Sequence, residues 1–350
     1  MKRLCYFLGA GLCLLFLTST VFAVRVTALY QAKIPVSSQT AEERNRFLQA
    51  GLTQVLIKVS GNPQIISNPQ VKARLGSANS LMQEFSYAPQ PGSSTKPFLL
   101  QLDFDSEGIN NLLREAGAPI WGQNRPLILV WLESEIPNQP AEMMTSDSAN
   151  FILPLLKQQA DRRGLPIIFP AMDVTDLSQV SVNDIVTMAI PVLTNAAKRY
   201  GSDAILVGRM IQNSNGYTTQ WNLVMGDDQW SWTLAGKTPE DTLTALADNV
   251  ANTLAGRYAS LLTNSVQSKI TLKITGISED DDLSQLMNYL KHLTPVTDVQ
   301  LDGVTGTDVI VTISLRGTQN SFLQAISIGQ KLTRVSDDTN QTMSVYQWNH

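Results

Sequence analysis

The spacing of hydrophobic and polar positions divides the chain into three blocks. In the first block, apolar residues alternate along VRVTALYQAKIPV, residues 24–36, and this predicts a strand. The next apolar residues recur every three or four positions up to Gly61, which predicts a helix that begins with a capping box of Thr40 and Glu43. The block is completed by two strands and a helix, predicted over 81–87, 98–104 and 107–116.

The second block opens with residues 127–132, which are apolar without alternation, as expected for a strand covered on both faces. Helical spacing over 182–200 predicts a long helix in which Pro191 marks a kink or a break. In AKRYGSDAILVGRM, residues 197–210, that helix ends and another apolar strand follows. The other predicted elements are a helix over 151–163, a strand over 165–169, a hairpin over 217–234 and a helix beginning at Thr238 and Pro239.

The third block alternates over 270–274, becomes helical over 283–293, and alternates again on both sides of a glycine-rich turn. A helix over 322–332 and a strand over 343–348 complete the order.

We therefore expect α/β and α+β architecture in three small modules. The first module, β-α-β-β-α, is assigned to residues 24–122, and the second, a mixed-sheet α/β sandwich, to residues 123–265. The third, a ferredoxin-like β-α-β-β-α-β module, is assigned to residues 266–350. Modules of roughly 100 residues are large enough to bury cores of their own.

The first 23 residues have the pattern of a secretory signal peptide. Lys2 and Arg3 form a positive start, residues 4–17 are uninterruptedly apolar, and Ala23 closes a match to a cleavage site. We expect export and cleavage after Ala23, with a leader retained as a membrane anchor as the open alternative. No later segment approaches the roughly 20 apolar residues of a membrane helix, so no transmembrane segment is expected in the mature chain.

Composition narrows the chemistry of the exported chain. Both cysteines, Cys5 and Cys13, fall inside the leader, so disulfides and thiol chemistry are not expected in the mature chain. Without the leader, 24 basic and 30 acidic residues remain, a formal charge of −6, which disfavours nucleic acid as a partner. Two histidines, His292 and His350, are too few to favour a Ser-His-Asp triad or a multi-histidine metal site. We predict no cofactor and no metal.

Tryptophans and a pair of acids keep a second interpretation open. Trp221, Trp230 and Trp232 alternate with polar residues, which is typical of a half-buried hairpin but also compatible with a glycan platform. Asp173 and Asp176 follow a predicted strand and are the acid pair best placed for chemistry at a strand end. The alternative function is thus a periplasmic glycan-binding protein or hydrolase.

Three stretches together resemble a known family. They are ERNRFLQAGLTQVLIKVSGNPQIISNP, NNLLREAGAPIWGQNRPLILVWL and AAKRYGSDAILVGRM. They look like the proteobacterial domain-of-unknown-function family 2066, over nearly the whole mature chain. The resemblance implies export and assigns no activity.

Residues 123–265 also resemble, more weakly, the small α/β domain of envelope assembly proteins. These include the amino-terminal domain of TolB, the curli secretion lipoprotein and outer-membrane activators of penicillin-binding proteins. The resemblance lies in the strand after YGSDAILVG, the tryptophan-bearing hairpin and the closing helix. It implies a domain that binds partners without catalysis, whereas the missing lipobox puts outer-membrane anchoring in doubt.

We therefore expect a non-catalytic periplasmic interaction or assembly protein of the Gram-negative cell envelope, possessing no enzymatic activity. Its expected partners are envelope proteins of an outer-membrane, secretion or motility assembly. Gly201 and Gly208 are expected to shape the turn and the strand end rather than to serve chemistry. The candidate interaction surface comprises Trp121, Arg125, Arg199, Arg209, Asp173 and Asp176.

Overall fold

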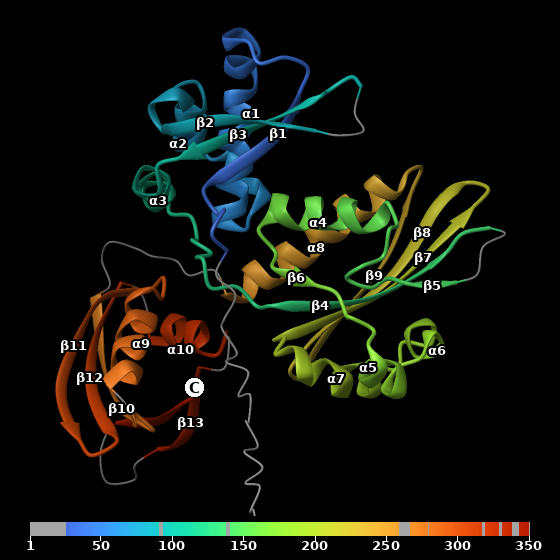
Figure 1. The fold of residues 1–350 in the computed structure, drawn as a ribbon. Helices are drawn as coiled ribbons and strands as arrows, with labels where there is room; N and C mark the ends of the chain where they lie inside the picture. Colours follow the sequence, from blue (N-terminus) through green and yellow to red (C-terminus); the bar gives the residue numbers. More distant parts are fainter. Residues whose placement is uncertain are drawn as a thin grey trace, which may run out of the picture.

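The computed structural model describes residues 26–90, 94–137, 141–258, 267–278, 280–316, 319–328, 331–337 and 343–349. The predicted leader and His350 lie outside these residues. The chain is a mixed α/β protein with three sheets, 40% helix and 34% strand, which confirms the predicted fold class. Each sheet belongs to one of three successive modules (Figure 1).

The N-terminal module has the predicted β-α-β-β-α order, with short helices added after the first long one. Its elements are β1 (Gln31–Val36), α1 (Ala41–Ser60), η1 (Pro63–Ser67), α2 (Pro69–Leu75), η2 (Ala78–Ser80), β2 (Met82–Pro89), β3 (Phe98–Phe104) and α3 (Ser106–Glu115). The antiparallel sheet has the order β1-β3-β2, so β1 lies at an edge. The apolar stripe of α1 packs on this sheet and forms the module's core.

The capping box at the start of α1 forms only in part. The backbone N–H of Glu43 donates to Thr40 Oγ1 over 3.3 Å, as predicted. The Glu43 carboxylate, however, accepts hydrogen bonds from the backbone N–H and the hydroxyl of Ser37. These bonds lower the pKa of Glu43, the backbone one most. The acid thus ties the preceding loop to the helix instead of capping Thr40. The helix ends at Ser60, one residue before Gly61, as expected.

The middle module contains a mixed sheet with helices on both faces. Its elements are β4 (Ile128–Glu135), β5 (Glu142–Met143), α4 (Ile152–Arg163), β6 (Ile167–Ile168), α5 (Val174–Gln179), α6 (Val182–Val186), α7 (Ile190–Ala197), η3 (Lys198–Tyr200), β7 (Ala204–Asn213), β8 (Gly216–Met225), β9 (Asp228–Gly236) and α8 (Pro239–Tyr258). The sheet order is β5-β4-β7-β8-β9, and β4 runs parallel to β6 and β7. Helices α4 and α8 cover one face, and α5 to α7 lie over the other (Figure 1).

Two local expectations for this module can be compared with the structure. The helical stretch over 182–200 is broken into α6, α7 and η3, and Pro191 stands in the first turn of α7, where its missing N–H costs nothing. On β7, a Cβ at Gly208 would overlap the indole ring of Trp221, its cross-strand neighbour on β8. Gly208 therefore lies inside β7, which continues to Asn213, and makes room for the core of the sheet; the expectation that it shapes a strand end was wrong.

The C-terminal module has one strand more than the ferredoxin-like order. Its elements are β10 (Gln267–Thr275), α9 (Asp280–Lys291), β11 (Val296–Thr305), β12 (Asp308–Arg316), α10 (Gln319–Ile326), β13 (Leu332–Asp337) and β14 (Ser344–Trp348). The sheet order is β11-β12-β10-β14-β13, and β14 runs parallel to β10. The helix predicted over 322–332 ends at Ile326, and the β-branched residues Thr333 and Val335 belong to the added edge strand β13.

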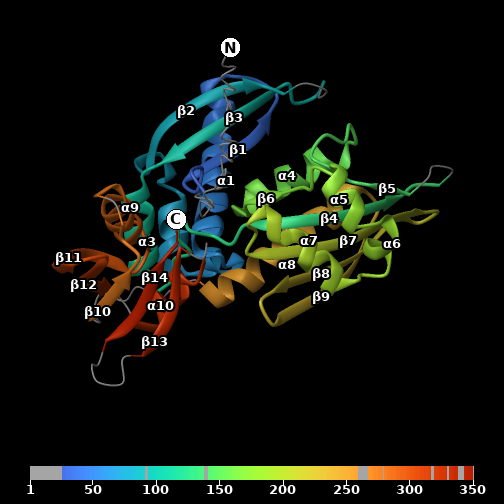
Figure 2. The same ribbon diagram turned by 60° about the horizontal axis from the view of Figure 1, so that its bottom comes forward.

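The segment between α3 and β4 touches all three modules. Ile120 belongs to the N-terminal core and Trp121 to the middle core. Gly122 packs against the side chain of Thr294 in the C-terminal module. Both views show this segment where the three modules meet (Figures 1 and 2).

Candidate binding cleft

The six candidate interaction residues lie in three separate places. Trp121 and Arg125 are buried where the N-terminal and middle modules meet, with 1% and 0% of their surface exposed. Asp173, Asp176 and Arg199 form a cluster beside α5 and α7. Arg209 lies in the middle of β7, which runs on to Asn213, and not at the strand end expected from the sequence; it has its own acidic partners. The structure therefore does not assemble them into one surface.

Arg125 holds the junction of the two modules together. Its guanidinium donates five hydrogen bonds of 2.7–3.1 Å, all to backbone carbonyls, and it stacks 3.9 Å from the ring centroid of Trp121. The acceptors are the carbonyl oxygens of Lys58, Trp121, Gly122, Arg163 and Gly164. These bonds use every N–H that an arginine side chain offers. Burial, and then the nearby Arg163, lower the pKa of Arg125 to about 9, so it is charged at neutral pH.

A left-handed glycine makes this arrangement possible. Gly164, which ends α4, has φ of 67°, and a Cβ there would lie 2.6 Å from Arg125 Nη1. A neighbouring arginine, Arg163, extends the junction by binding Asp248 and Asn252 of α8, each over 2.8 Å. The same Arg163 donates to the carbonyl of Gly61 in the N-terminal module. Arg125 and Arg163 are thus structural residues that join α1, α4 and α8.

The predicted acid pair is bound to a single arginine. Arg199 Nη1 lies 2.7 Å from Asp173 Oδ1 and 2.8 Å from Asp176 Oδ1. Asp173 also caps the N-terminus of α5, and Asp176 accepts hydrogen bonds from the Tyr200 hydroxyl and from the backbone N–H of Met172. The hydrogen bonds from Arg199 hold the pKa of Asp173 well below its usual range, whereas burial and Asp176 raise that of Tyr200 to about 12. Each carboxylate oxygen of the pair thus accepts a hydrogen bond from Arg199, from Tyr200 or from the backbone.

Arg209 pairs with two acids of β4. Its Nε lies 3.1 Å from Glu133 Oε2, and its Nη2 lies 2.5 Å from Glu135 Oε2. Burial raises the pKa of Glu133, and its other oxygen, Oε1, is buried without a hydrogen-bond partner in the described part of the chain. The segment that the sequence singled out therefore carries a local ion-pair group between the neighbouring strands β4 and β7.

The tryptophans face the core. Trp221 is 1% exposed, and Trp230 and Trp232 are half-buried against the same hydrophobic cluster that α4 and α8 cover. The acid pair lies on the other side of the sheet, next to the cluster under α5 to α7. The indoles and the carboxylates do not share a surface.

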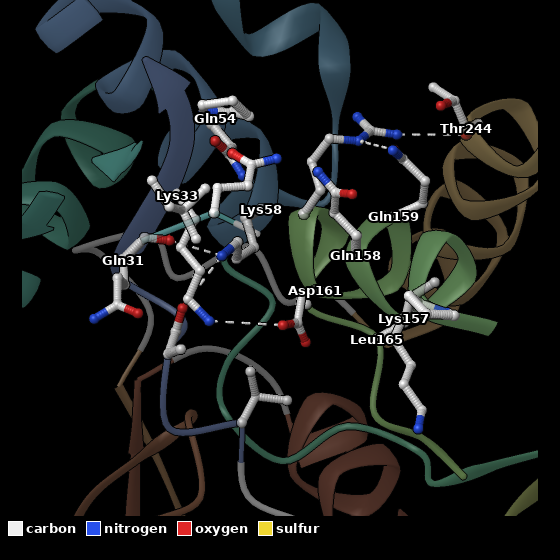
Figure 3. Close-up of a pocket in the computed structure, with 18 of the residues that line it drawn as sticks. Gln31, Lys33, Gln54, Lys58, Lys157, Gln158, Gln159, Asp161, Leu165 and Thr244 are labelled. Carbon is white, nitrogen blue, oxygen red and sulfur yellow. Dashed lines mark hydrogen bonds and ion pairs between the residues drawn. The ribbon is translucent and has the colours of Figure 1, made fainter. Parts of the chain in front are cut away.

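Sequence reasoning missed a large hollow between the N-terminal and middle modules, here called the inter-module cleft. It has a volume of about 1020 Å³ and separates β1 and the end of α1 from α4 and the start of α8. Figure 3 shows Gln31, Lys33, Gln54 and Lys58 on the first wall. The facing wall displays Gln158, Gln159, Asp161 and Thr244 (Figure 3).

The lining of the inter-module cleft is basic and rich in amides. Its basic residues are Lys33, Lys58, Lys96, Lys157 and Arg162, and its acidic residues are Asp161 and Glu240. Its amide side chains are Gln31, Gln54, Gln90, Gln158 and Gln159. A basic cleft stands out in a chain whose formal net charge is −4. Amides donate and accept hydrogen bonds and ammonium groups attract anions, so the cleft is chemically suited to a polar, negatively charged ligand.

Two of the cleft's charged side chains have well-defined partners. Lys33 Nζ reaches across the cleft to Asp161 Oδ2 over 3.7 Å, and both side chains are largely solvated. Lys58 is 4% exposed and donates to the carbonyls of Ala28 and Gln31, over 3.2 and 2.7 Å. Burial lowers the pKa of Lys58 to about 8. Lys58 thus supports the first wall, while Lys33 stays within reach of a ligand.

A local signal for this cleft was present in the sequence. Gln31 and Lys33 recur at strand spacing, Gln54 and Lys58 at helical spacing, and Lys157 and Asp161 at helical spacing again. Each pair marks one polar face of a predicted element. Only the docking of α1 beside α4 brings these faces together.

Comparisons with known proteins assign no activity. A model of a domain of unknown function, DUF8605, matches residues 23–122, the N-terminal module. Its number differs from that of family 2066, which the sequence resembled. No curated protein matches the chain.

Among solved structures, the crystal structure of TolB from Acinetobacter baumannii is a distant match. The alignment has 12% sequence identity and a TM-score of 0.22, and it covers 58% of this chain. It spans 38% of the TolB chain, well under half of that protein's length. A likeness at this level carries no information about partners or ligands.

Two further findings concern only the described residues. None of their helices combines the length and the apolar character needed to cross a bilayer. Within the same ranges, no group of three or more His, Cys, Asp and Glu residues is placed to hold a metal ion.

Proposed function

We propose that this protein is a non-catalytic interaction or assembly factor of the Gram-negative cell envelope, exported by its leader, with envelope proteins as partners. Membership of family 2066 is part of this proposal. The observation that carries it is the inter-module cleft, a large polar hollow whose two walls come from different modules. Clefts between domains are common binding sites, and this one displays amines and amides suited to holding a ligand.

The packing around the cleft supports binding by a preformed surface. Arg125 and Arg163 fix α1 against α4 and α8, so the two walls are held by buried hydrogen bonds rather than by the cleft's own contacts. A wall that is already ordered loses little conformational entropy when a partner binds. The alternative function, glycan binding or hydrolysis by Asp173, Asp176 and the tryptophans, gains no support, because these groups lie on opposite faces of the middle sheet.

The test is crosslinking of the tagged mature protein in cells, followed by mass spectrometry of the envelope fraction. One dominant and reproducible envelope protein is the expected result. A chain that yields no partner above the background of an unrelated exported protein would contradict the proposal. Sites of crosslinking identified at the residue level would also show which module the partner contacts.

A further inference from the structure

We propose that the inter-module cleft binds an extended, acidic peptide segment of a partner protein. This inference rests on the proposed function and narrows it, because it names the chemistry of the segment that would be recognised. Five basic side chains and two acidic ones line the cleft, in a chain that is acidic as a whole. A concave surface with an excess of positive charge concentrates ligands of negative charge.

The amide side chains favour a peptide among acidic ligands. Five glutamines line the cleft, and each carries both a donor and an acceptor, as a peptide group does. Glycan sites typically use an aromatic platform, and no Trp, Tyr or Phe occurs among the residues that line this cleft. The volume of about 1020 Å³ is at the upper end of small-molecule pockets, which are roughly 300–1,000 Å³. An open hollow of this size suits a length of chain better than a single small molecule.

Recognition would proceed through side chains rather than by addition of a strand. The edge strand β1 borders the cleft, and it carries Lys33 as its third residue and Pro35 as its fifth. A lysine and a proline on an edge strand oppose pairing with another strand. Lys58 moreover already occupies the carbonyl of Gln31 at the start of β1. The peptide's carboxylates would instead meet Lys33 from one wall and Lys157 from the other.

Asp161 acts as an internal competitor in this arrangement. Its carboxylate lies 3.7 Å from Lys33 Nζ, and both side chains are exposed enough to exchange partners with solvent. A carboxylate of the incoming peptide would displace Asp161 from Lys33. Removing the charge of Asp161 should therefore strengthen binding, which a purely structural role of the ion pair does not predict.

The experiment measures the fluorescence anisotropy of a dye-labelled peptide of alternating glycine and glutamate, titrated with the full mature chain. The controls are the same peptide with glutamine in place of glutamate and a polyanionic polysaccharide. We expect binding of the glutamate peptide that weakens steeply between about 0.05 M and 0.3 M salt, because screening reduces the attraction of exposed charges. No measurable binding of the glutamate peptide, or equal binding of the glutamine peptide, would overturn the inference. Stronger binding of the polysaccharide would also overturn it.

Variants locate the binding to the cleft. The double substitution Lys33→Glu and Lys157→Glu should weaken binding at least about tenfold, since like charges would face the peptide. Asp161→Asn should strengthen binding by about twofold to fivefold, the range expected from one exposed ion pair. The matched control is Lys269→Glu with Lys291→Glu, two exposed positions in the C-terminal module that change the net charge by the same amount. Equal weakening by this control would overturn the inference, because only net charge would then matter.

A second variant protects the test against misfolding. Lys33→Gln with Lys157→Gln removes the charges without introducing repulsion, at two exposed positions. It should keep the circular dichroism spectrum of the parent and still weaken binding by about threefold or more. If the peptide does not bind while crosslinking in cells still yields a dominant partner, the proposed function stands and only the cleft's ligand class is wrong.

Discussion

The junction and the inter-module cleft use the same kinds of side chain in opposite ways. At the junction, Arg125 is fully buried and its five N–H groups all meet backbone carbonyls. In the cleft, Lys33 is exposed and meets one exposed carboxylate at 3.7 Å. A buried cation bound to carbonyls cannot leave without stranding its acceptors, whereas an exposed cation can exchange partners at little cost. Side-chain type alone therefore does not separate architecture from recognition.

Of the substitutions considered, Arg125→Ala should lower the stability of the protein most, because it removes the residue that joins the modules at the junction. Several buried carbonyls would lose their donor, and each unsatisfied buried group costs roughly 1–3 kcal/mol. We expect the free energy of unfolding to fall by about 3 kcal/mol or more, measured by urea titration with tryptophan fluorescence. Arg125→Lys is the control, because it keeps the charge and loses the forked geometry. A loss below about 1 kcal/mol for the alanine variant would mean that the junction does not depend on this residue.

Lys58 lies at both regions, because its carbonyl binds Arg125 at the junction and its side chain lines the cleft. The pH dependence of stability therefore tests how its amine is held. Its folded pKa of about 8 lies below the ordinary value of 10.5, so between these pH values the unfolded chain binds more protons than the folded one. Stability should therefore rise as the pH increases from about 8 to 10.5, by on the order of 3 kcal/mol.

Lys58→Met should remove this rise. Urea titrations at several alkaline pH values compare the two slopes, and Lys33→Met supplies the control for an exposed lysine of the same cleft. Equal slopes for the parent chain and Lys58→Met would show that the amine is not held in the buried state described above.

Arg199→Ala tests an intermediate case, a cation that bridges one exposed and one buried acid. Asp176 would keep its bonds to Tyr200 and Met172, so we expect a smaller loss of stability than that caused by Arg125→Ala. Because the folded pKa of Asp173 is lowered, its contribution is present above the ordinary pKa of 3.8 and is lost as the pH falls below that value.

The acid sensitivity of this cluster should decrease without its arginine, while the backbone hydrogen bonds to Asp173 keep part of it. The parent chain should lose more stability below about pH 4 than Arg199→Ala, as measured by thermal unfolding across that range. Parallel curves for the two proteins would contradict the role given to Arg199.

Lys33→Ala should have the smallest effect on stability. The ion pair with Asp161 is exposed on both sides, and such pairs contribute about 0.2–1 kcal/mol at most. We expect a change within about 0.5 kcal/mol by urea titration, alongside a clear loss of peptide binding. A loss of stability comparable to that of Arg125→Ala would contradict the view that the junction cation is structural and the cleft cation is not.

Local patterns predicted most of the elements. The alternation over 217–234 found the hairpin of β8 and β9, and Pro191 marked a real helix boundary. The fifth strand of the C-terminal sheet was missed, because Leu332 fitted the helical spacing as well as the strand that it begins. Periodicity cannot separate two structures at a residue that satisfies both.

The site was much less accessible to sequence reasoning than the fold. Arg125 binds a carbonyl 67 positions earlier and another 39 positions later in the sequence. The residues next to it in the sequence do not indicate either contact. Arg199, Asp173 and Asp176 were singled out as charged groups near predicted strands, but their mutual ion pairs depend on how α5 packs on α7. The cleft itself is a property of two docked modules, so no single segment encodes it.

Because Gly208 leaves space for the indole of Trp221, we expect these two positions to vary together among related sequences. A side chain at position 208 would occupy the volume of the indole, and a small residue at 221 would leave a void beneath the glycine. A substitution at either position alone should lower the stability of the fold. Related chains should therefore carry either both residues or neither. Such paired substitution would be visible in a set of homologous sequences as covariation between two sites 13 residues apart, on neighbouring strands of one sheet.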